Sequence, residues 1–428
     1  MKLANLVVFG VAGLTAALAA QMGCSPVGQR GTDQCDVFDD PACENSSGSG
    51  KGGAGQTSSG SSDGGDIIFP AGGTGGNSSG SGSANCSTDP NIDDDKDGAT
   101  ENQGDCNDCD KNVGPGAVEV PTDPNDPMAQ PSDEDCNGMV DDVASSCDAN
   151  LALTDTDANN GVRATDICQF VGPGELKWGV LSAMYVRANG APAPPGTQVG
   201  LLDKFGPNVN PQGGSRVLAL ATGTARIPNQ PDACGLSSCS GAGPGTAPPG
   251  FPQDPPTCPV SQEIWDDVGL EVRLRAPTNA TGYKFNFKFY SFEYPEWVCQ
   301  TYNDQFISYV KPAPMGSING NISFDTKGNP VSVNVAFFEV CDPSPGYPCP
   351  LGTGEMQGTG FNQWNNAGAT SWLQSQAPIT GGQEFIIRYT IWDTGDDAYD
   401  STALVDNFQW IANGGTVTVE TVPVPIPK

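Results

Sequence analysis

Two stretches in the second half of the chain alternate apolar and polar residues, which is the period of half-buried β-strands. Leu270, Val272 and Leu274 alternate with charged residues, and the aromatic residues of 283–289 alternate with lysine and asparagine. Further strands are expected at 177–187, 216–221, 305–310, 332–340, 384–392, 401–411 and 416–422. The pattern predicts a mainly β protein built as an antiparallel sandwich or jelly roll.

The residues able to form a hydrophobic core are unevenly distributed along the chain. All seven tryptophans, all nine tyrosines and 14 of the 17 phenylalanines lie beyond residue 150. One β domain is therefore expected at 149–422, with a disulfide-pinned loop at about 228–259. Residues 46–85 contain 14 glycines and 11 serines, so they are predicted to form a disordered linker. Residues 86–148, the Asp-rich segment, contain no aromatic side chain.

The N-terminus has the features of an export signal. Residues 1–23 have a positive start and an apolar stretch ending in small residues, as in a secretory signal peptide. Two processing sites are open: an Ala-x-Ala-like site at 17–20, or Cys24, which resembles the lipid-modified cysteine of a bacterial lipobox although Gln21 is unusual there. An acidic, cysteine-containing stub at 24–45 follows. We expect an exported cell-surface or outer membrane lipoprotein, attached to the envelope membrane through its lipid only, or alternatively a secreted protein.

The cysteine content is consistent with export, because disulfides persist in oxidising compartments. Apart from Cys24, the disulfide candidates are Cys35, Cys43, Cys86, Cys106, Cys109, Cys136, Cys147, Cys168, Cys234, Cys239, Cys258, Cys299, Cys341 and Cys349. Spacing favours the pairs Cys35–Cys43, Cys147–Cys168, Cys234–Cys239, Cys258–Cys299 and Cys341–Cys349. The other four, Cys86, Cys106, Cys109 and Cys136, would share two bridges of open connectivity or, alternatively, form a zinc site.

Charge and composition exclude several functions. The chain has 50 acidic and 19 basic residues, a net charge of −31, and no histidine. Such a charge repels phosphate backbones, so no nucleic-acid partner is expected. Without histidine, Ser-His-Asp catalysis and histidine-ligated zinc are impossible. We expect no catalytic residue and no enzymatic activity.

A ladder of carboxylates in the Asp-rich segment predicts a calcium site. Asp93, Asp95 and Asp97 occupy alternate positions before Gly98, a spacing that converges oxygen ligands on a hard cation. An EF-hand would carry a bidentate glutamate where this chain has glycine, so Glu101 or Asp105 is expected to complete the shell. The alternative is a solvated acidic spacer.

A second ladder follows the first. Asp133, Asp135 and Asn137 precede Gly138 with the same spacing, and Asp141 and Asp142 stand behind them. Because the segment has almost no apolar residues, calcium ions and disulfides are expected to stabilise it.

A third acidic group lies in the β domain. Asp393, Asp396 and Asp406 are candidate calcium ligands, along with nearby Asp397, Asp400 and Asn407, and Glu293, Asn303 and Asp304 could contribute from a neighbouring strand. The alternative is that these side chains cap turns.

Two families are similar to parts of this sequence. The strings DDDKDG (93–98), GDCND (104–108), PGAVE (115–119) and DEDCNGMVDD (133–142) resemble the metal-binding repeat of bacterial surface proteins, itself similar to thrombospondin type 3 repeats. The strings NATGYKFNF (279–287), EYPEWVC (293–299), YNDQF (302–306), NISFD (321–325), IWDTGD (391–396) and DSTALVDNF (400–408) resemble the choice-of-anchor L domain. The second resemblance implies an exported protein and no established common activity.

Binding or adhesion at the cell surface is the expected function, with surface glycans or other surface proteins as candidate partners. Tyr290, Tyr294, Trp297 and Tyr302 would either stack on sugars or pack in the core. The alternatives are a secreted glycan-active hydrolase using a carboxylate pair such as Glu293 and Glu296, or a purely structural envelope protein.

Overall fold

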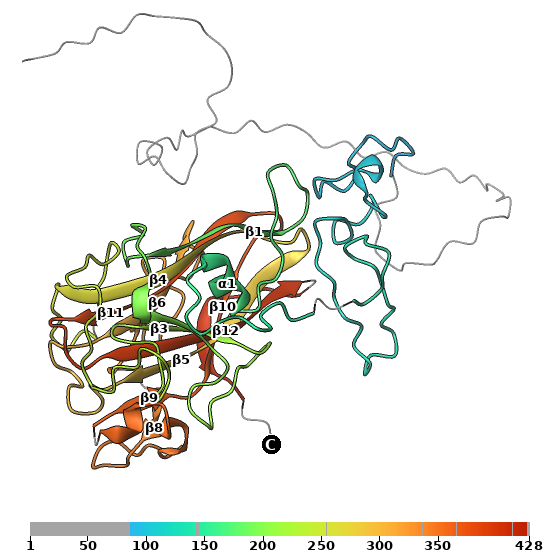
Figure 1. Ribbon diagram of the computed structural model, residues 1–428. Coiled ribbons are helices and arrows are strands. Elements are labelled where there is room, and N and C mark those ends of the chain that lie inside the picture. The colour runs from blue at the N-terminus through green and yellow to red at the C-terminus, as the bar shows by residue number, and fades with distance from the viewer. Residues whose placement is uncertain are drawn as a thin grey trace, which may run out of the picture. The chain divides into compact units, whose positions relative to one another are not determined.

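The computed structural model describes residues 86–425 except 143–144, 254, 336, 365 and 413 (Figure 1). The expected signal peptide, Cys24, the stub with Cys35 and Cys43, and the linker lie outside these residues. The described part is mainly β, with antiparallel sheets and few helices, as the sequence predicts. No helix in it is both long enough and apolar enough to cross a membrane.

Two antiparallel sheets form the β domain. The smaller sheet has the order β1-β4-β11-β6-β7, and the larger has the order β13-β10-β5-β12-β3-β2, with β9 paired to β5 and β8 to β9. The smaller sheet consists of β1 (Gly179–Val186), β4 (Ile264–Arg275), β6 (Gln305–Lys311), β7 (Val331–Ser332) and β11 (Glu384–Thr394). The larger consists of β2 (Val199–Leu202), β3 (Val217–Ala221), β5 (Ala280–Ser291), β8 (Phe338–Cys341), β9 (Gly368–Thr370), β10 (Leu373–Pro378), β12 (Ser401–Ala412) and β13 (Glu420–Pro423).

The core lies where the alternating side chains of the two sheets meet. Leu270 and Leu274 of β4 lie opposite Tyr389 and Phe385 of β11 in the smaller sheet, and all four are fully buried. They belong to the same hydrophobic cluster as Phe285 and Phe287 of β5 in the larger sheet. β4 and β11 belong to the smaller sheet, whereas the strands that directly follow them in the chain, β5 and β12, belong to the larger sheet. The central strands of the two sheets therefore enclose one apolar layer.

Some expected strands differ in the structure. The expected strand at 332–340 is wrong: β7 and β8 are separated by a turn in which the Val335 N–H donates to the Ser332 carbonyl. The strand expected at 416–422 is shorter, since β13 starts at Glu420. The loop expected at about 228–259 is confirmed, because its described residues form no helix or strand and contain the Cys234–Cys239 disulfide.

The structure also contains elements that the hydrophobic pattern does not predict. The pattern does not predict β10, because its inward-facing residue Ser375 is polar. Its hydroxyl lies 2.7 Å from that of Thr421 and 2.9 Å from that of Ser323. The short helix α1 (Ala158–Arg163) begins after Asp157, whose side chain accepts from the Asn159 N–H. β2 and β9 are too short to show a period.

Candidate metal centre

The Asp-rich segment folds into loops because its aspartates bind their own backbone. Side-chain oxygens of Asp95, Asp97 and Asp105 each accept the N–H of the residue two positions later, at 3.0, 2.8 and 2.8 Å. Gly98 and Gly104 have positive φ angles of 103° and 102°, a conformation that favours glycine. The only regular element described in 86–142 is a 3-10 turn at Glu101–Gln103.

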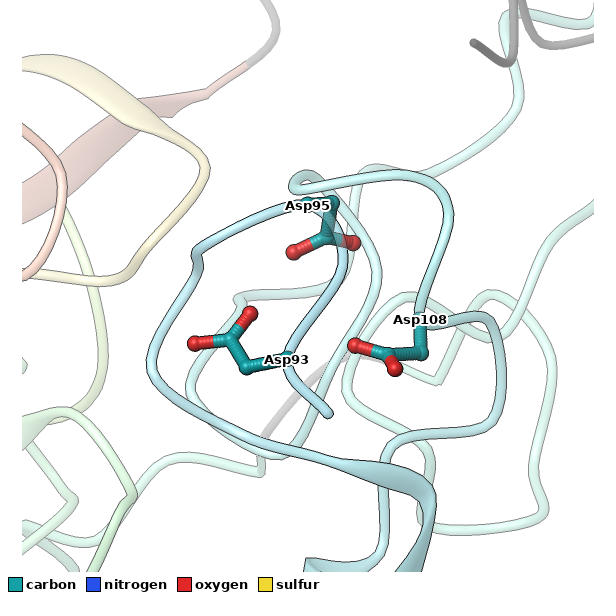
Figure 2. Close-up of side chains that lie close together, drawn as sticks. All are labelled: Asp93, Asp95 and Asp108. Carbon is teal, nitrogen blue, oxygen red and sulfur yellow. The ribbon is translucent and has the colours of Figure 1, made fainter. Parts of the chain in front are cut away.

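Five aspartates of these loops form two overlapping groups. Asp93, Asp95 and Asp108 each offer an oxygen within 4.8 Å of the others, and so do Asp95, Asp97 and Asp105. Asp95 therefore belongs to both groups. Figure 2 shows the Asp93, Asp95 and Asp108 carboxylates around a common space, supplied by two separate stretches of the loop.

The hydrogen bonding of this cluster is incomplete in a systematic way. The Oδ2 atoms of Asp95, Asp97, Asp105 and Asp108 are buried and accept no hydrogen bond. The Oδ1 atoms of the same residues are hydrogen-bonded to backbone N–H groups, so the loops hold each carboxylate by one oxygen. Buried unpaired carboxylate oxygens are costly, and a bound cation would satisfy them.

The electrostatics of the cluster agree with this geometry. Burial raises the pKa of Asp95 to about 7, and the negative charges of Asp97, Asp105 and Asp108 add to the effect. Burial, with the charges of Asp97 and Asp108 among its neighbours, raises the pKa of Asp105 to about 6. Both shifts express the cost of several negative charges in one small volume, which a cation would remove.

A second group lies around the second ladder. Glu119, Asp135 and Asp142 each offer an oxygen within 4.8 Å of the others. Glu119 Oε1 accepts the Asp135 N–H at 3.0 Å, whereas Oε2 is buried and unpartnered. Burial is the largest cause of the raised pKa of both Glu119 and Asp135.

The remaining predicted ligands of the Asp-rich segment have other contacts. Asp133 accepts the N–H groups of Asn137 and Gly138 at 3.0 and 2.9 Å. The Asn137 amide donates to Asp142 at 3.2 Å, and Asp141 accepts from Thr122. Glu101 is exposed and belongs to neither group that contains Asp95. The structure instead adds two residues to the groups: Asp108, the last residue of the string GDCND, and Glu119, the last residue of the string PGAVE.

The carboxylates predicted in the β domain do not form one group. Asp393, at the end of β11, is 1% exposed and lies close to the charges of Asp304 and Asp400. Asp406, on β12, instead accepts the Gln212 N–H at 2.6 Å and lies beside Asp166. Asp396 is half-buried and accepts the Ala398 N–H at 3.2 Å.

Every described cysteine is disulfide-bonded, and the connectivity left open by the sequence is now resolved. Cys86 pairs with Cys109 and Cys106 with Cys136. The pairs Cys147–Cys168, Cys234–Cys239, Cys258–Cys299 and Cys341–Cys349 are those that spacing favours. Since the four cysteines of the Asp-rich segment are oxidised, the thiolate zinc site is wrong.

The aromatic and glutamate candidates of the β domain lie in different environments. Tyr290 and Tyr294 are buried at 0% and 5% exposure, so they pack in the core. Trp297 and Tyr302 are half-buried and make an edge contact with ring centroids 5.3 Å apart. Glu293 is buried and accepts the Asp304 N–H at 3.1 Å, whereas Glu296 is exposed and accepts from Asn366. A buried and an exposed carboxylate do not resemble a hydrolase pair flanking one bond.

Comparison with known proteins finds a family match within the β domain. Residues 275–407 match the model of the Choice-of-anchor L domain, a stretch from the end of β4 to β12 that includes central strands of both sheets. No curated protein and no solved structure matches the chain. A match of this kind suggests a surface-anchored or exported protein and a non-enzymatic role. The chain thus contains a stretch, residues 275–407, that matches the Choice-of-anchor L domain.

Proposed function

We propose that this chain is a cell-surface protein whose Asp-rich segment binds calcium and whose β domain serves binding or adhesion. One observation carries the calcium assignment: the buried Oδ2 atoms of Asp95, Asp97, Asp105 and Asp108 lack hydrogen-bond partners and belong to carboxylates grouped in one loop cluster. A solvated acidic spacer would leave such oxygens in water.

The donor set favours calcium over other cations. All candidate ligands are carboxylate oxygens, which hard cations prefer, and no histidine or free described cysteine is present to select zinc. The donors sit on irregular loops, which accommodate the six to eight variable ligands of calcium better than the strict octahedron of magnesium.

Bound calcium would have a structural role in this segment. Between residues 86 and 142 the described buried apolar side chains are those of Ala99 and Ala117, far too little for a core. Ions and the two disulfides of the segment would therefore supply the stabilisation that apolar packing supplies elsewhere. In this role calcium fixes a spacer between the membrane attachment and the β domain.

We further propose that Cys24 is lipid-modified and tethers the chain to the outer envelope membrane. The sequence Gly23-Cys24-Ser25 and the Gly/Ser-rich stretch at 46–85 support this assignment. Mass spectrometry of the mature N-terminus tests it: an acylated Cys24 is expected, whereas an unmodified N-terminus at Gln21 would refute it.

The binding role is tested by glycan arrays and adhesion to whole cells, using the full chain with calcium and with chelator. Calcium-dependent retention without turnover is expected. Turnover of a glycan would instead support the alternative that the chain is a glycan-active hydrolase. A lack of retention on every surface would support a purely structural role in the envelope. Asp95→Asn, compared with the exposed-residue variant Asp123→Asn, shows whether retention depends on the proposed calcium sites.

A further inference from the structure

Three buried carboxylates come together at one end of the β domain. Asp304 directly precedes β6, Asp393 lies near the end of β11, and Asp400 directly precedes β12. Their exposures are 1%, 1% and 5%. β6 and β11 are hydrogen-bonded neighbours, and Gln305 lies opposite Trp392. This pairing brings Asp304 beside Asp393, although the two residues are 89 positions apart in the sequence.

Two of the three carboxylates are held in place by the surrounding backbone and a hydroxyl. Asp304 Oδ1 accepts the Thr394 N–H at 3.2 Å, and Oδ2 accepts the Ser401 hydroxyl at 2.6 Å. Asp304 thus accepts hydrogen bonds from Thr394 and Ser401, the residues that directly follow Asp393 and Asp400. Asp400 Oδ2 accepts the Cys239 N–H at 2.9 Å, from the disulfide-closed loop Cys234–Cys239.

No donor reaches hydrogen-bond geometry with either oxygen of the third carboxylate, although the Thr222 and Asp304 side chains lie close to it. Both oxygens of Asp393 are buried and unpartnered, and so is Oδ1 of Asp400. Asp393 lies within electrostatic reach of both Asp304 and Asp400, whose negative charges act on it. A fully buried aspartate with two unpaired oxygens is rare, because its desolvation costs several kcal/mol unless a proton or a cation compensates.

Among the described residues, no ion pair involves these three carboxylates. The ion pairs of the described residues involve other carboxylates: Arg187 pairs with Asp267, the neighbour of Asp266, and Arg388, five positions before Asp393, pairs with Glu271. Asp266, 3% exposed, adds a further negative charge that acts on Asp400. Burial raises the pKa of Asp393 and of Asp304, in the direction expected for anions crowded in a dry environment.

We infer that Asp304, Asp393 and Asp400 bind a hard divalent cation inside the β domain, at a site separate from those of the Asp-rich segment. Asp393 offers two oxygens and Asp400 one that accept no hydrogen bond. Asp304 lies against Asp393 and also accepts hydrogen bonds from Thr394 and Ser401, so it contributes from the start of β6. The cation joins the starts of β6 and β12 to the end of β11 and so fastens the two sheets at this end.

The site is connected to the surface of the domain. Asp400 also lines a cavity whose wall includes Arg226, Phe292, Phe361 and Trp364 and the Cys234–Cys239 loop. Trp364 and Leu236 at this cavity are 43% and 61% exposed, so the cavity provides a route from solvent to Asp400. Because of this partial enclosure, we expect slow exchange of the bound cation.

The first test uses the full chain with its other sites weakened. In an Asp95→Asn, Asp135→Asn background, elemental analysis for calcium, magnesium and manganese after dialysis should still find one equivalent of divalent cation. Prolonged treatment with chelator should remove it and lower the thermal midpoint of the β domain. Absence of any bound cation in this background would overturn the inference. This result is independent of calcium binding by the Asp-rich segment.

The second test places the cation. In the same background, Asp393→Asn should lose the equivalent, whereas Asp397→Asn, an exposed aspartate of the same turn, should keep it. Unchanged cation content in Asp393→Asn would contradict the assignment. A raised thermal midpoint in Asp393→Asn with no cation in the parent would show that the three carboxylates share protons instead. If Asp393→Asn fails to fold, the cation content of Asp400→Asn and the effect of chelator on the parent protein test the assignment in its place.

Discussion

Cys106 and Cys136, which are 30 positions apart in the sequence, are joined by a disulfide with Cα atoms 5.6 Å apart. Cys106 stands between Asp105 and Asp108 of the first carboxylate cluster, and Cys136 directly follows Asp135 of the second group. The Cys106 N–H also donates to Cys136 Sγ at 3.1 Å. A covalent bond therefore connects the two candidate metal centres in a segment that has no hydrophobic core.

Removal of this disulfide should loosen both centres. We expect the Cys106→Ser, Cys136→Ser double variant to bind calcium more weakly and to be cleaved faster within 86–142 in limited proteolysis. A disulfide closing a loop of this length typically contributes about 2–4 kcal/mol. The matched control is Cys234→Ser, Cys239→Ser, which opens a short loop in the β domain and should leave proteolysis of the Asp-rich segment unchanged. Equal cleavage rates for wild type and the first variant would contradict this prediction.

Asp95 should matter more to calcium affinity than any other single aspartate of the first ladder, because it belongs to both overlapping groups. Asp95→Asn should weaken calcium binding at this cluster at least about tenfold, as measured by titration calorimetry. Asp123→Asn removes the same charge at an exposed position of the same segment and should have little effect. Similar affinities for the two variants would mean that net charge alone attracts the ion.

Calcium affinity should depend on pH in a defined direction. The pKa of Asp95 is raised to about 7 and that of Asp105 to about 6, above the value of 3.8 for an unperturbed aspartate. The cation-free folded segment therefore takes up protons that the unfolded chain does not, so its stability falls as the pH rises through this range. Calcium needs the deprotonated carboxylates, so its affinity should rise over the same range.

The measurement is the calcium dissociation constant at about pH 5.5 and about pH 8, where at least about a tenfold difference is expected. Asp95→Asn should flatten this dependence because it removes the group with the higher pKa of the two. An affinity that is constant with pH in the wild type would contradict the role of these buried carboxylates.

The apolar layer of the β domain should be sensitive to truncation. Phe287 is fully buried, and its ring centroid lies 5.2 Å from that of Phe306 on the other sheet. Phe287→Ala should lower the free energy of unfolding of the β domain by about 3–5 kcal/mol, measured by denaturant titration. Met184→Ala on β1, at a side chain 39% exposed, should cost far less. Equal losses would show that Phe287 does not lie in the core.

The sequence predicts those strands whose inward positions are strictly apolar. This holds for β4, β5, β11 and β12, since alternation is visible wherever one face is buried. β10 was not, because Ser375 and Ala377 face inward there, and Ser375 is stabilised by hydroxyl contacts that no hydrophobic pattern shows. The split between β7 and β8 depends on a turn within an apolar run, which periodicity alone does not reveal.

The sequence predicts only those residues of the candidate site that lie close together in the sequence. Ladder spacing predicts Asp93, Asp95 and Asp97, because aspartates two residues apart form consecutive turns. Asp105 is predicted only as one of two residues, with Glu101, that could complete the shell. Asp108 and Glu119 reach their groups from other loops, and the disulfides and long-range hydrogen bonds that place them leave no periodic signal. By contrast, Asp304, which is expected from the sequence to contribute from a neighbouring strand, does meet Asp393 through the pairing of β6 with β11.

Limited proteolysis of the full chain, with calcium and after removal of calcium by chelator, tests the central claim most directly. The account predicts that residues 86–142 resist cleavage in calcium, become rapidly cleaved in chelator, and recover resistance when calcium is restored, while the β strands of both sheets stay protected. Equal resistance of 86–142 in calcium and in chelator would show that divalent cations do not hold this segment in shape.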